Sequence, residues 1–138
     1  MKKAALILIA ALGLSAVAQA QTSTASNEET LPSGVRILHL TKGTGAQPTA
    51  DSNVTVNYRG TLLSTGAEFD SSYKRGQPAS FGLRGVIPCW TQSLTHVAVG
   101  GKVRVLCPAA TAYGARGAGG VIPPNANLVF DIELLAVK

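Results

Sequence analysis

The chain has 138 residues, of which 46% are hydrophobic and 14% are charged, and its formal net charge is +5. This length allows one compact domain with a single core rather than two domains. The basic residues are scattered, and beyond the first three residues only Lys74 and Arg75 are adjacent. A nucleic-acid-binding surface normally gathers its positive charge on one face, so we expect no nucleic-acid partner.

Residues 1–20 have the pattern of a cleavable signal peptide. Two lysines are followed by an almost entirely apolar run over residues 4–16, and the segment ends in Ala-Gln-Ala. This is the order of a basic start, an apolar centre and a small-x-small cleavage site. The run is too short to cross a bilayer, although an uncleaved anchor is the alternative. We expect cleavage after Ala20 and a periplasmic or secreted product that is not bound to the membrane.

Residues 21–33 are polar and show no periodicity, which predicts a disordered lead-in. The segment is too short and too poor in apolar residues to form a dimerising helix. From residue 34 to residue 138 the chain has the pattern of one α+β domain. We expect this domain to be a monomer.

Alternation of apolar and polar residues predicts the strands. It is clearest over residues 54–62, where Val54, Val56 and Tyr58 share one face and polar side chains occupy the other. The other predicted strands cover residues 35–40, 102–107 and 128–137, with a short extended piece at 68–70. Together they predict an antiparallel sheet of five to six strands.

Only one stretch has the spacing of an amphipathic helix. Pro88 suits its first turn, and the glycines at 100–101 are expected to end it. Its apolar stripe consists of Val86, Trp90, Leu94 and Val97. One short helix and one sheet must each cover the apolar face of the other, so the economical fold is a curled sheet wrapped around the helix.

A long glycine-rich loop is predicted between Pro108 and Pro124. Loops of that length inside compact domains are usually functional. Tyr113 lies in this loop, where an aromatic side chain has no core to fill. We therefore expect the functional site to lie beside the loop.

The usual catalytic groups are poorly represented. His39 and His96 are expected to be surface residues, so a Ser/His/Asp triad is not indicated. Glu68 and Asp70 share a face, but no group beside them points to acid–base chemistry. The glycine-rich segment 114–120 lacks the Lys-Ser/Thr ending of a phosphate-binding loop. With two cysteines and two histidines in all, we expect neither a metal site nor a cofactor.

Five segments in colinear order carry a family resemblance. They are VTVNYRGTL at 54–62, EFDSS at 68–72, SFGLRGVIPCW at 80–90, VGGKVRV at 99–105 and AYGARGAGGVIPPNANLVFDIELL at 112–135. With these segments the chain resembles the FKBP-type peptidyl-prolyl cis/trans isomerases, and among them the exported bacterial branch that includes the macrophage infectivity potentiator. The resemblance begins near Gly34 and implies an FKBP-like fold.

The resemblance also implies a site. Trp90 would form the floor of a pocket, while the backbone N–H of Ile87 and the hydroxyl of Tyr113 would bind carbonyl groups of a peptide or of a macrolide inhibitor such as tacrolimus or rapamycin. Asp70, Ile87 and Tyr113 would serve catalysis. The pocket would be completed by Tyr58, Phe69, Phe81, Val86, Ile122 and Phe130.

The implied activity is isomerisation of X-Pro bonds in proline-containing polypeptides of exported proteins. Rotation about a peptide bond meets a barrier of roughly 18–20 kcal/mol, and no bond need be broken to cross it. A dry aromatic pocket with fixed hydrogen-bond donors could favour the twisted amide without covalent chemistry. A peptide-binding chaperone module with little turnover is the alternative, because fold alone does not establish activity.

Cys89 and Cys107 depart from the family, which usually has glycine at the first position and an ordinary strand residue at the second. Cys107 shares the parity of Val103 and Val105, and Cys89 lies close to the inward stripe of the helix. Both should face the interface between helix and sheet, so we expect a disulfide in an oxidising compartment. Two buried free thiols are the alternative, and the spacing does not favour a thiol-redox protein. We expect no N-terminal dimerisation region of the kind that the long exported members have.

Overall fold

The computed structural model describes residues 27–138, so the predicted signal peptide and most of the predicted lead-in lie outside the described residues. The described chain forms a single antiparallel sheet of seven strands in the order β1-β2-β6-β7-β3-β4, with β5 also paired to β3. The strands are β1 (Glu28–Thr30), β2 (Arg36–Thr41), β3 (Asn53–Leu62), β4 (Glu68–Ser71), β5 (Ala79–Gly82), β6 (Lys102–Cys107) and β7 (Leu128–Val137).

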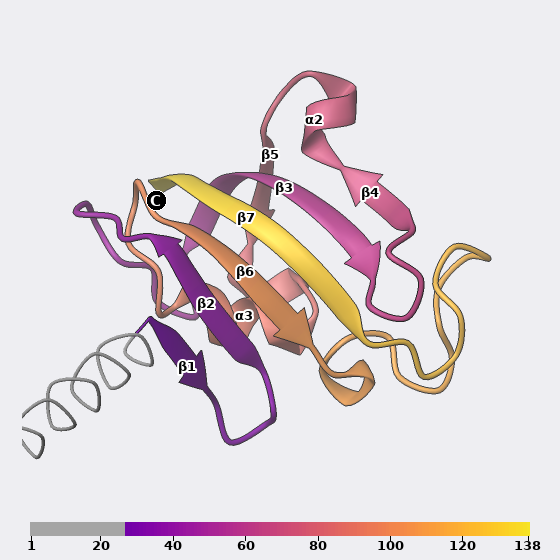
Figure 1. Cartoon of the computed structure of the whole chain (residues 1–138). Helices are drawn as coiled ribbons and strands as arrows, with labels where there is room; N and C mark the ends of the chain where they lie inside the picture. Colours follow the sequence, from indigo (N-terminus) through magenta and orange to yellow (C-terminus); the bar gives the residue numbers. More distant parts are fainter. Residues whose placement is uncertain (1–26) are drawn as a thin grey trace, which may run out of the picture.

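The two longest strands, β3 and β7, lie side by side at the centre of the sheet (Figure 1). Their pairing runs from Val54 opposite Val137 to Leu62 opposite Leu128, with one register shift after Thr55. Residues alternate between the two faces of such a ladder, so the apolar positions of both strands reach the same face. The alternation that predicted these strands therefore also builds the face on which the helix packs.

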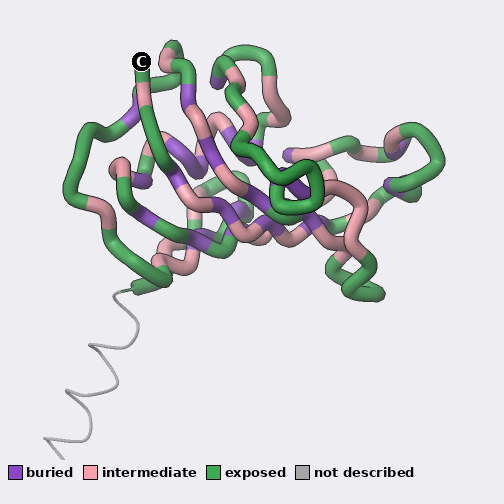
Figure 2. Tube along the Cα trace, turned by 90° about the horizontal axis from the view of Figure 1, so that it is seen from above, coloured by how far each residue is buried: buried purple, intermediate pink, exposed green. Residues whose placement is uncertain are grey.

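Helix α3 (Pro88–Leu94) lies against the concave face of the sheet (Figure 1). Trp90 and Leu94 are buried in the core together with the inward residues of β2, β3, β6 and β7. Figure 2 shows buried residues along the sheet strands and exposed residues gathered in the loops. No helix within residues 27–138 is long and apolar enough to cross a membrane.

The helix is shorter than the sequence pattern predicts. It ends at Leu94, well before the glycines at 100–101, because His96 and Val97 donate their N–H groups to the carbonyls of Ser93 and Leu94, three residues back. These tighter turns end the α-helix. Val86 lies before the helix and Val97 beyond it, although Val97 is still buried.

Strand β1 corrects the prediction that residues 21–33 form a disordered lead-in, at least for the part that is described. Its backbone pairs with β2, from Glu28 opposite Leu38 to Thr30 opposite Arg36. Its polar sequence carries no strand pattern, so the strand depends on tertiary contacts. Glu29 accepts hydrogen bonds from Nε2 of His39 at 2.5 Å and from Nδ1 of His96 at 3.1 Å.

The structure corrects the prediction that His39 is a surface residue, since its side chain is only 10% exposed.

Three further short elements, α2 (Ser72–Arg75), β5 and η1 (Leu83–Gly85), were not predicted from the sequence. The helical turn α2 begins with the hydroxyl of Ser71 accepting from the N–H of Lys74 and ends at Gly76 in the left-handed conformation. Strand β5 and the 3₁₀ turn η1 then lead into α3.

Candidate active site

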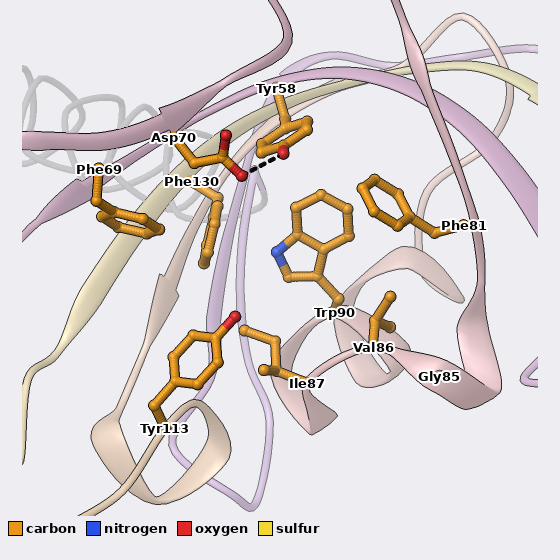
Figure 3. Close-up of a pocket in the computed structure, with 10 residues that line it drawn as sticks. All are labelled: Tyr58, Phe69, Asp70, Phe81, Gly85, Val86, Ile87, Trp90, Tyr113 and Phe130. Carbon is orange, nitrogen blue, oxygen red and sulfur yellow. Dashed lines mark hydrogen bonds between the residues drawn. The ribbon is translucent and has the colours of Figure 1, made fainter. Parts of the chain in front are cut away.

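A cavity of about 410 Å³ opens on the concave side of the sheet beside the N-terminal end of α3 (Figure 3). This size is within the usual range for small-molecule and peptide pockets. Its lining comes from β3, β4, β5, β7, η1, α3 and the loop after β6. The lining residues are Tyr58, Phe69, Asp70, Phe81, Gly85, Val86, Ile87, Trp90, Tyr113 and Phe130. The structure thus brings together every predicted site residue except Ile122.

Trp90 is the centre of an aromatic cluster. Its ring lies edge-to-face against Tyr58, Phe81 and Phe130, with centroid distances of 5.2, 5.3 and 5.3 Å. Such pairs are favourable beyond the area that they bury. Trp90 is only 4% exposed, and its indole N–H has no hydrogen-bond partner among the described residues. The floor of the cavity is therefore a closely packed aromatic surface that carries one N–H unpaired within residues 27–138.

Gly60 on β3 makes room for a second aromatic pair beside this floor. Phe69 and Phe130 meet edge-to-face at 5.6 Å. A Cβ on Gly60 would lie 2.6 Å from Phe69 and 2.8 Å from Phe130, closer than such atoms can approach. A side chain at position 60 would have to displace one wall of the cavity.

Asp70 is the charged group at the cavity. Its carboxylate accepts hydrogen bonds from the hydroxyl of Tyr58, from Nη1 of Arg75 at 2.8 Å and from the N–H of Ser71 at 2.9 Å. Burial raises the pKa of Asp70, but these hydrogen bonds outweigh it and leave the pKa below its ordinary value of 3.8. Asp70 is therefore an ionised acceptor that orients its neighbours.

Tyr58 is held in the protonated state by the same network. Burial and the hydrogen bond to Asp70 raise the pKa of Tyr58 above its ordinary value of 10.0. Arg75 donates from Nη2 to the Tyr58 hydroxyl at 3.0 Å, and its guanidinium lies 5.7 Å from the centre of the Tyr58 ring. The network fixes the Tyr58 ring, which forms one wall of the cavity.

Two potential hydrogen-bond donors belong to residues that line the cavity. Ile87 immediately precedes α3, and its backbone N–H makes no hydrogen bond within the described part of the chain. Tyr113 is 40% exposed and belongs to the loop after β6. Figure 3 shows its hydroxyl pointing toward the side chain of Ile87. A bound peptide could accept hydrogen bonds from both groups while its apolar part rests on Trp90.

The loop between Pro108 and Pro124 is more ordered than the sequence suggests. It contains the 3₁₀ turn η2 (Ala109–Thr111) and a bridge between Ala118 and Ile122. Gly117 has a φ of 69°, and a Cβ there would lie 2.3 Å from the carbonyl oxygen of Ile122. The bridge turns Ile122 inward.

Ile122 is therefore not a lining residue of this cavity, contrary to the prediction. It is 5% exposed and packs in the core cluster.

Two residues of the site, Gly85 and Arg75, were not identified from the sequence. Gly85 lines the cavity without a side chain, so no residue pattern indicates it. Arg75 could have been found from its place five residues after Asp70, within the only adjacent basic pair of the domain.

The predicted disulfide is confirmed. Cys89 and Cys107 are bonded, with their Cα atoms 5.7 Å apart, and both are fully buried. The bond lies next to the cavity floor, because Cys89 precedes Trp90 in the chain.

Within residues 27–138 no group of three His, Cys, Asp or Glu residues has a geometry that could hold a metal ion.

A curled antiparallel sheet around one short helix, with an aromatic-floored cavity between them, defines the class of protein. The model of the family of FKBP-type peptidyl-prolyl cis-trans isomerases matches residues 44–135. The chain belongs to this family, and the predicted fold and resemblance are confirmed.

Individual relatives support the same assignment. The chain is 53% identical over 96 residues to FkpA, an FKBP-type isomerase of Escherichia coli K12, a match that covers 70% of this chain and 35% of that protein. It is 46% identical over 110 residues to the isomerase Mip of Coxiella burnetii, covering 80% of this chain and 47% of Mip. This chain thus spans about a third to a half of these curated relatives.

A solved structure has the same fold. The crystal structure of a peptidyl-prolyl cis-trans isomerase from Pseudomonas syringae superposes with a TM-score of 0.75 at 43% identity, over 81% of each chain. The similarity therefore extends beyond the segments that carry the family motifs.

Proposed function

We propose that this protein is a peptidyl-prolyl cis-trans isomerase that acts on X-Pro bonds of exported proteins. The observation that carries the proposal is the cavity itself, which combines the aromatic floor of Trp90 with two potential donors, the Ile87 N–H and the Tyr113 hydroxyl. Family membership supports the activity, because the relatives FkpA and Mip are named as isomerases.

The geometry suits a non-covalent mechanism. The proline ring would lie on Trp90 between Tyr58, Phe81 and Phe130, and these rings would shield the bound amide from water. A twisted amide has lost its resonance and is less dipolar than a planar one, so a dry surface favours it over the ground state. The two donors would hold the flanking carbonyls, which lowers the entropic cost of reaching the twisted geometry.

The three residues assigned to catalysis take different parts. Ile87 and Tyr113 donate directly to the peptide, whereas Asp70 keeps the Tyr58 ring in place through its hydroxyl. None of the three transfers a proton in this mechanism. Catalysis then depends on the shape and dryness of the cavity, which a macrolide such as tacrolimus or rapamycin would also fill.

We place this activity in the periplasm or outside the cell. A signal peptide over residues 1–20, cleaved after Ala20, would deliver the domain of residues 34–138 as a monomer that is free of the membrane. The buried disulfide supports this location, because such bonds persist in oxidising compartments. The mass of the mature protein recovered from cells tests the cleavage site directly.

The test of function is turnover of a proline-containing peptide, measured with and without rapamycin. We expect a rate well above the uncatalysed one that rapamycin abolishes. A peptide-binding chaperone module would instead bind the peptide and suppress aggregation without accelerating isomerisation. Binding without turnover would therefore overturn the isomerase proposal in favour of that alternative.

A further inference from the structure

The two donors at the cavity come from separate segments of the chain. Ile87 lies at the N-terminal end of α3, and Tyr113 lies two residues beyond η2. No hydrogen bond among the described residues joins one donor to the other. Their separation therefore depends on how the first turn of α3 is held against the end of β6, from which the Tyr113 segment departs.

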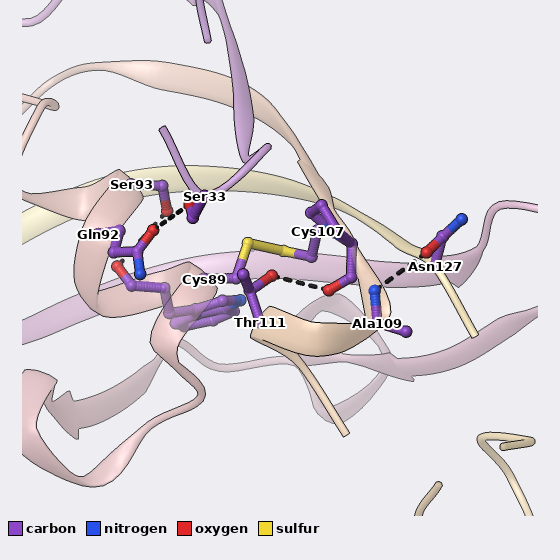
Figure 4. Close-up of a disulfide and its surroundings, with 10 residues drawn as sticks. Ser33, Cys89, Gln92, Ser93, Cys107, Ala109, Thr111 and Asn127 are labelled. Carbon is purple, nitrogen blue, oxygen red and sulfur yellow. Dashed lines mark hydrogen bonds between the residues drawn. A yellow bond between two sulfur atoms is a disulfide. The ribbon is translucent and has the colours of Figure 1, made fainter. Parts of the chain in front are cut away.

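The disulfide lies at that junction (Figure 4). Cys89 belongs to the first turn of α3, two residues after Ile87, and Cys107 is the last residue of β6. Both side chains are fully buried, and their Cα atoms are 5.7 Å apart. The bond thus joins the element that carries one donor to the strand that leads to the other.

The segment from Cys107 to Tyr113 is short and internally hydrogen-bonded. Thr111 donates to the carbonyl of Pro108 through both its N–H and its hydroxyl, at 2.9 and 2.7 Å. The N–H of Gly114 binds the carbonyl of Ala109 at 2.9 Å, and the N–H of Ala109 binds Oδ1 of Asn127 at 3.0 Å. Fixing the position of Cys107 therefore also restricts the position of Tyr113.

The other polar ties of α3 do not duplicate this link. Thr91 donates to the carbonyl of Leu83 at 2.6 Å, which joins the helix to η1, on the far side from Tyr113. Gln47 donates to the carbonyl of Thr95, just beyond the helix, and Ser33 donates to Gln92 in its later part. The first turn itself has no side-chain cap. Among the described residues, only the disulfide ties this turn to β6 by a bond rather than by apolar packing.

We propose that Cys89 and Cys107 are positioning residues for the isomerase reaction, acting through Ile87 and Tyr113. The inference rests on the proposed activity. Without the bond, the aromatic floor still binds proline, but the two donors shift relative to each other. We expect kcat to fall roughly 3- to 30-fold, because small misplacements of positioning groups are costly, while KM changes less than about twofold.

The sharpest comparison uses one sequence in two states. Refolding the protein in excess dithiothreitol converts the disulfide into two thiols, and the reagent leaves as its cyclic disulfide. The reduced and oxidised forms then differ by one S–S bond and two hydrogens, with no side chain replaced. Both are assayed at about 10 °C, after circular dichroism shows that both are folded.

A destabilised control separates positioning from stability. Val103→Ala removes buried volume from β6 but keeps the disulfide and lies outside the cavity. We expect its kcat to stay within about twofold of the oxidised protein. If the reduced form does not fold, the Cys89→Ala/Cys107→Val variant, which refills the space with apolar groups, replaces it.

The outcomes are distinct. An inactive oxidised protein overturns the isomerase proposal and this inference with it. An active oxidised protein whose disulfide-free form keeps the same kcat overturns the positioning role alone. The same conclusion follows if Val103→Ala loses as much kcat as the disulfide-free form, or if the loss lies in KM rather than kcat.

Discussion

At the scale of single residues, Tyr113 and Trp90 contribute to the site in different ways. Trp90 is almost completely buried, so it forms the core and the cavity floor at once. Tyr113 is substantially exposed, and its hydroxyl has no partner among the described residues. A change at Tyr113 can therefore separate activity from folding, whereas a change at Trp90 cannot.

Tyr113→Phe should lower kcat/KM, which corresponds to a loss of transition-state stabilisation of roughly 0.5–1.5 kcal/mol, the usual contribution of one hydrogen bond. The free energy of unfolding should change by less than about 0.5 kcal/mol. Peptide turnover and urea unfolding measure the two quantities. Tyr73→Phe is the matched control, since Tyr73 is 54% exposed and lies outside the cavity. A Tyr113→Phe protein that unfolds, or a control that loses as much activity, would show that Tyr113 has been misassigned.

The rate of isomerisation should be nearly flat between about pH 6 and 8. The lowered pKa of Asp70 keeps its carboxylate ionised throughout this range, and the raised pKa of Tyr58 keeps its hydroxyl protonated. No group at the cavity is asked to exchange a proton. Initial rates measured across the range, corrected for the uncatalysed reaction, test this expectation. A bell-shaped profile centred near pH 7 would argue for acid–base chemistry instead.

At the scale of elements, the sequence predicts those that combine length with periodicity. Strands β3, β6 and β7 and the position of α3 follow from apolar alternation and helical spacing. The elements that it misses are short and held by other means. Strand β1 is polar and depends on backbone pairing with β2, and α2 is a single turn defined by Ser71 and Gly76.

The candidate site shows the same division. The aromatic residues of the floor and walls could be predicted from the family motifs, and these residues lie on the regular elements β3, β4, β5, β7 and α3. Ile122 could not, since its direction depends on the bridge to Ala118 inside an irregular loop. Arg75 contacts Asp70 only because α2 turns the chain back toward β4. Such contacts depend on local turns, which residue periodicity does not encode.

Glu29→Gln should test what holds β1. The hydrogen bond from His39 lowers the pKa of Glu29 below its ordinary value of 4.5, with burial opposing and His96 adding to the effect. Ionised Glu29 therefore stabilises the fold above about pH 4.5, and this contribution is lost as the pH falls through the lower folded-state pKa. The variant should unfold about 0.5–1 kcal/mol more easily at pH 7, since the carboxylate is 39% exposed and partly screened.

Urea unfolding at pH 7 and near pH 3.5 measures this contribution, and the difference from the unmodified protein should shrink at the lower pH. Glu28→Gln is the control, because Glu28 pairs only with the exposed Arg36 among the described residues. A loss that grows toward low pH would contradict the assignment.

At the scale of the whole molecule, one covalent bond joins the two layers of the fold. The sheet and α3 otherwise meet through apolar packing, to which Trp90 and Leu94 contribute from the helix. The disulfide spans a sequence separation of 18 residues and connects the layers near the cavity rather than at the far end of the sheet. It therefore bears on global stability as well as on the geometry of the site.

Reduction of the disulfide should lower the free energy of unfolding by about 3 kcal/mol, the loop-closure entropy expected for a ring of this size. The effect should arise mainly in the unfolded chain, because fully buried thiols would pack as small apolar groups in the folded one. Urea unfolding of the oxidised and the reduced protein should give midpoints separated by roughly 1–3 M. The Cys89→Ala/Cys107→Val variant should resemble the reduced protein, since it lacks the same constraint. Equal midpoints for the oxidised and reduced forms would contradict the loop-closure argument, because the bond would then not restrict the unfolded chain.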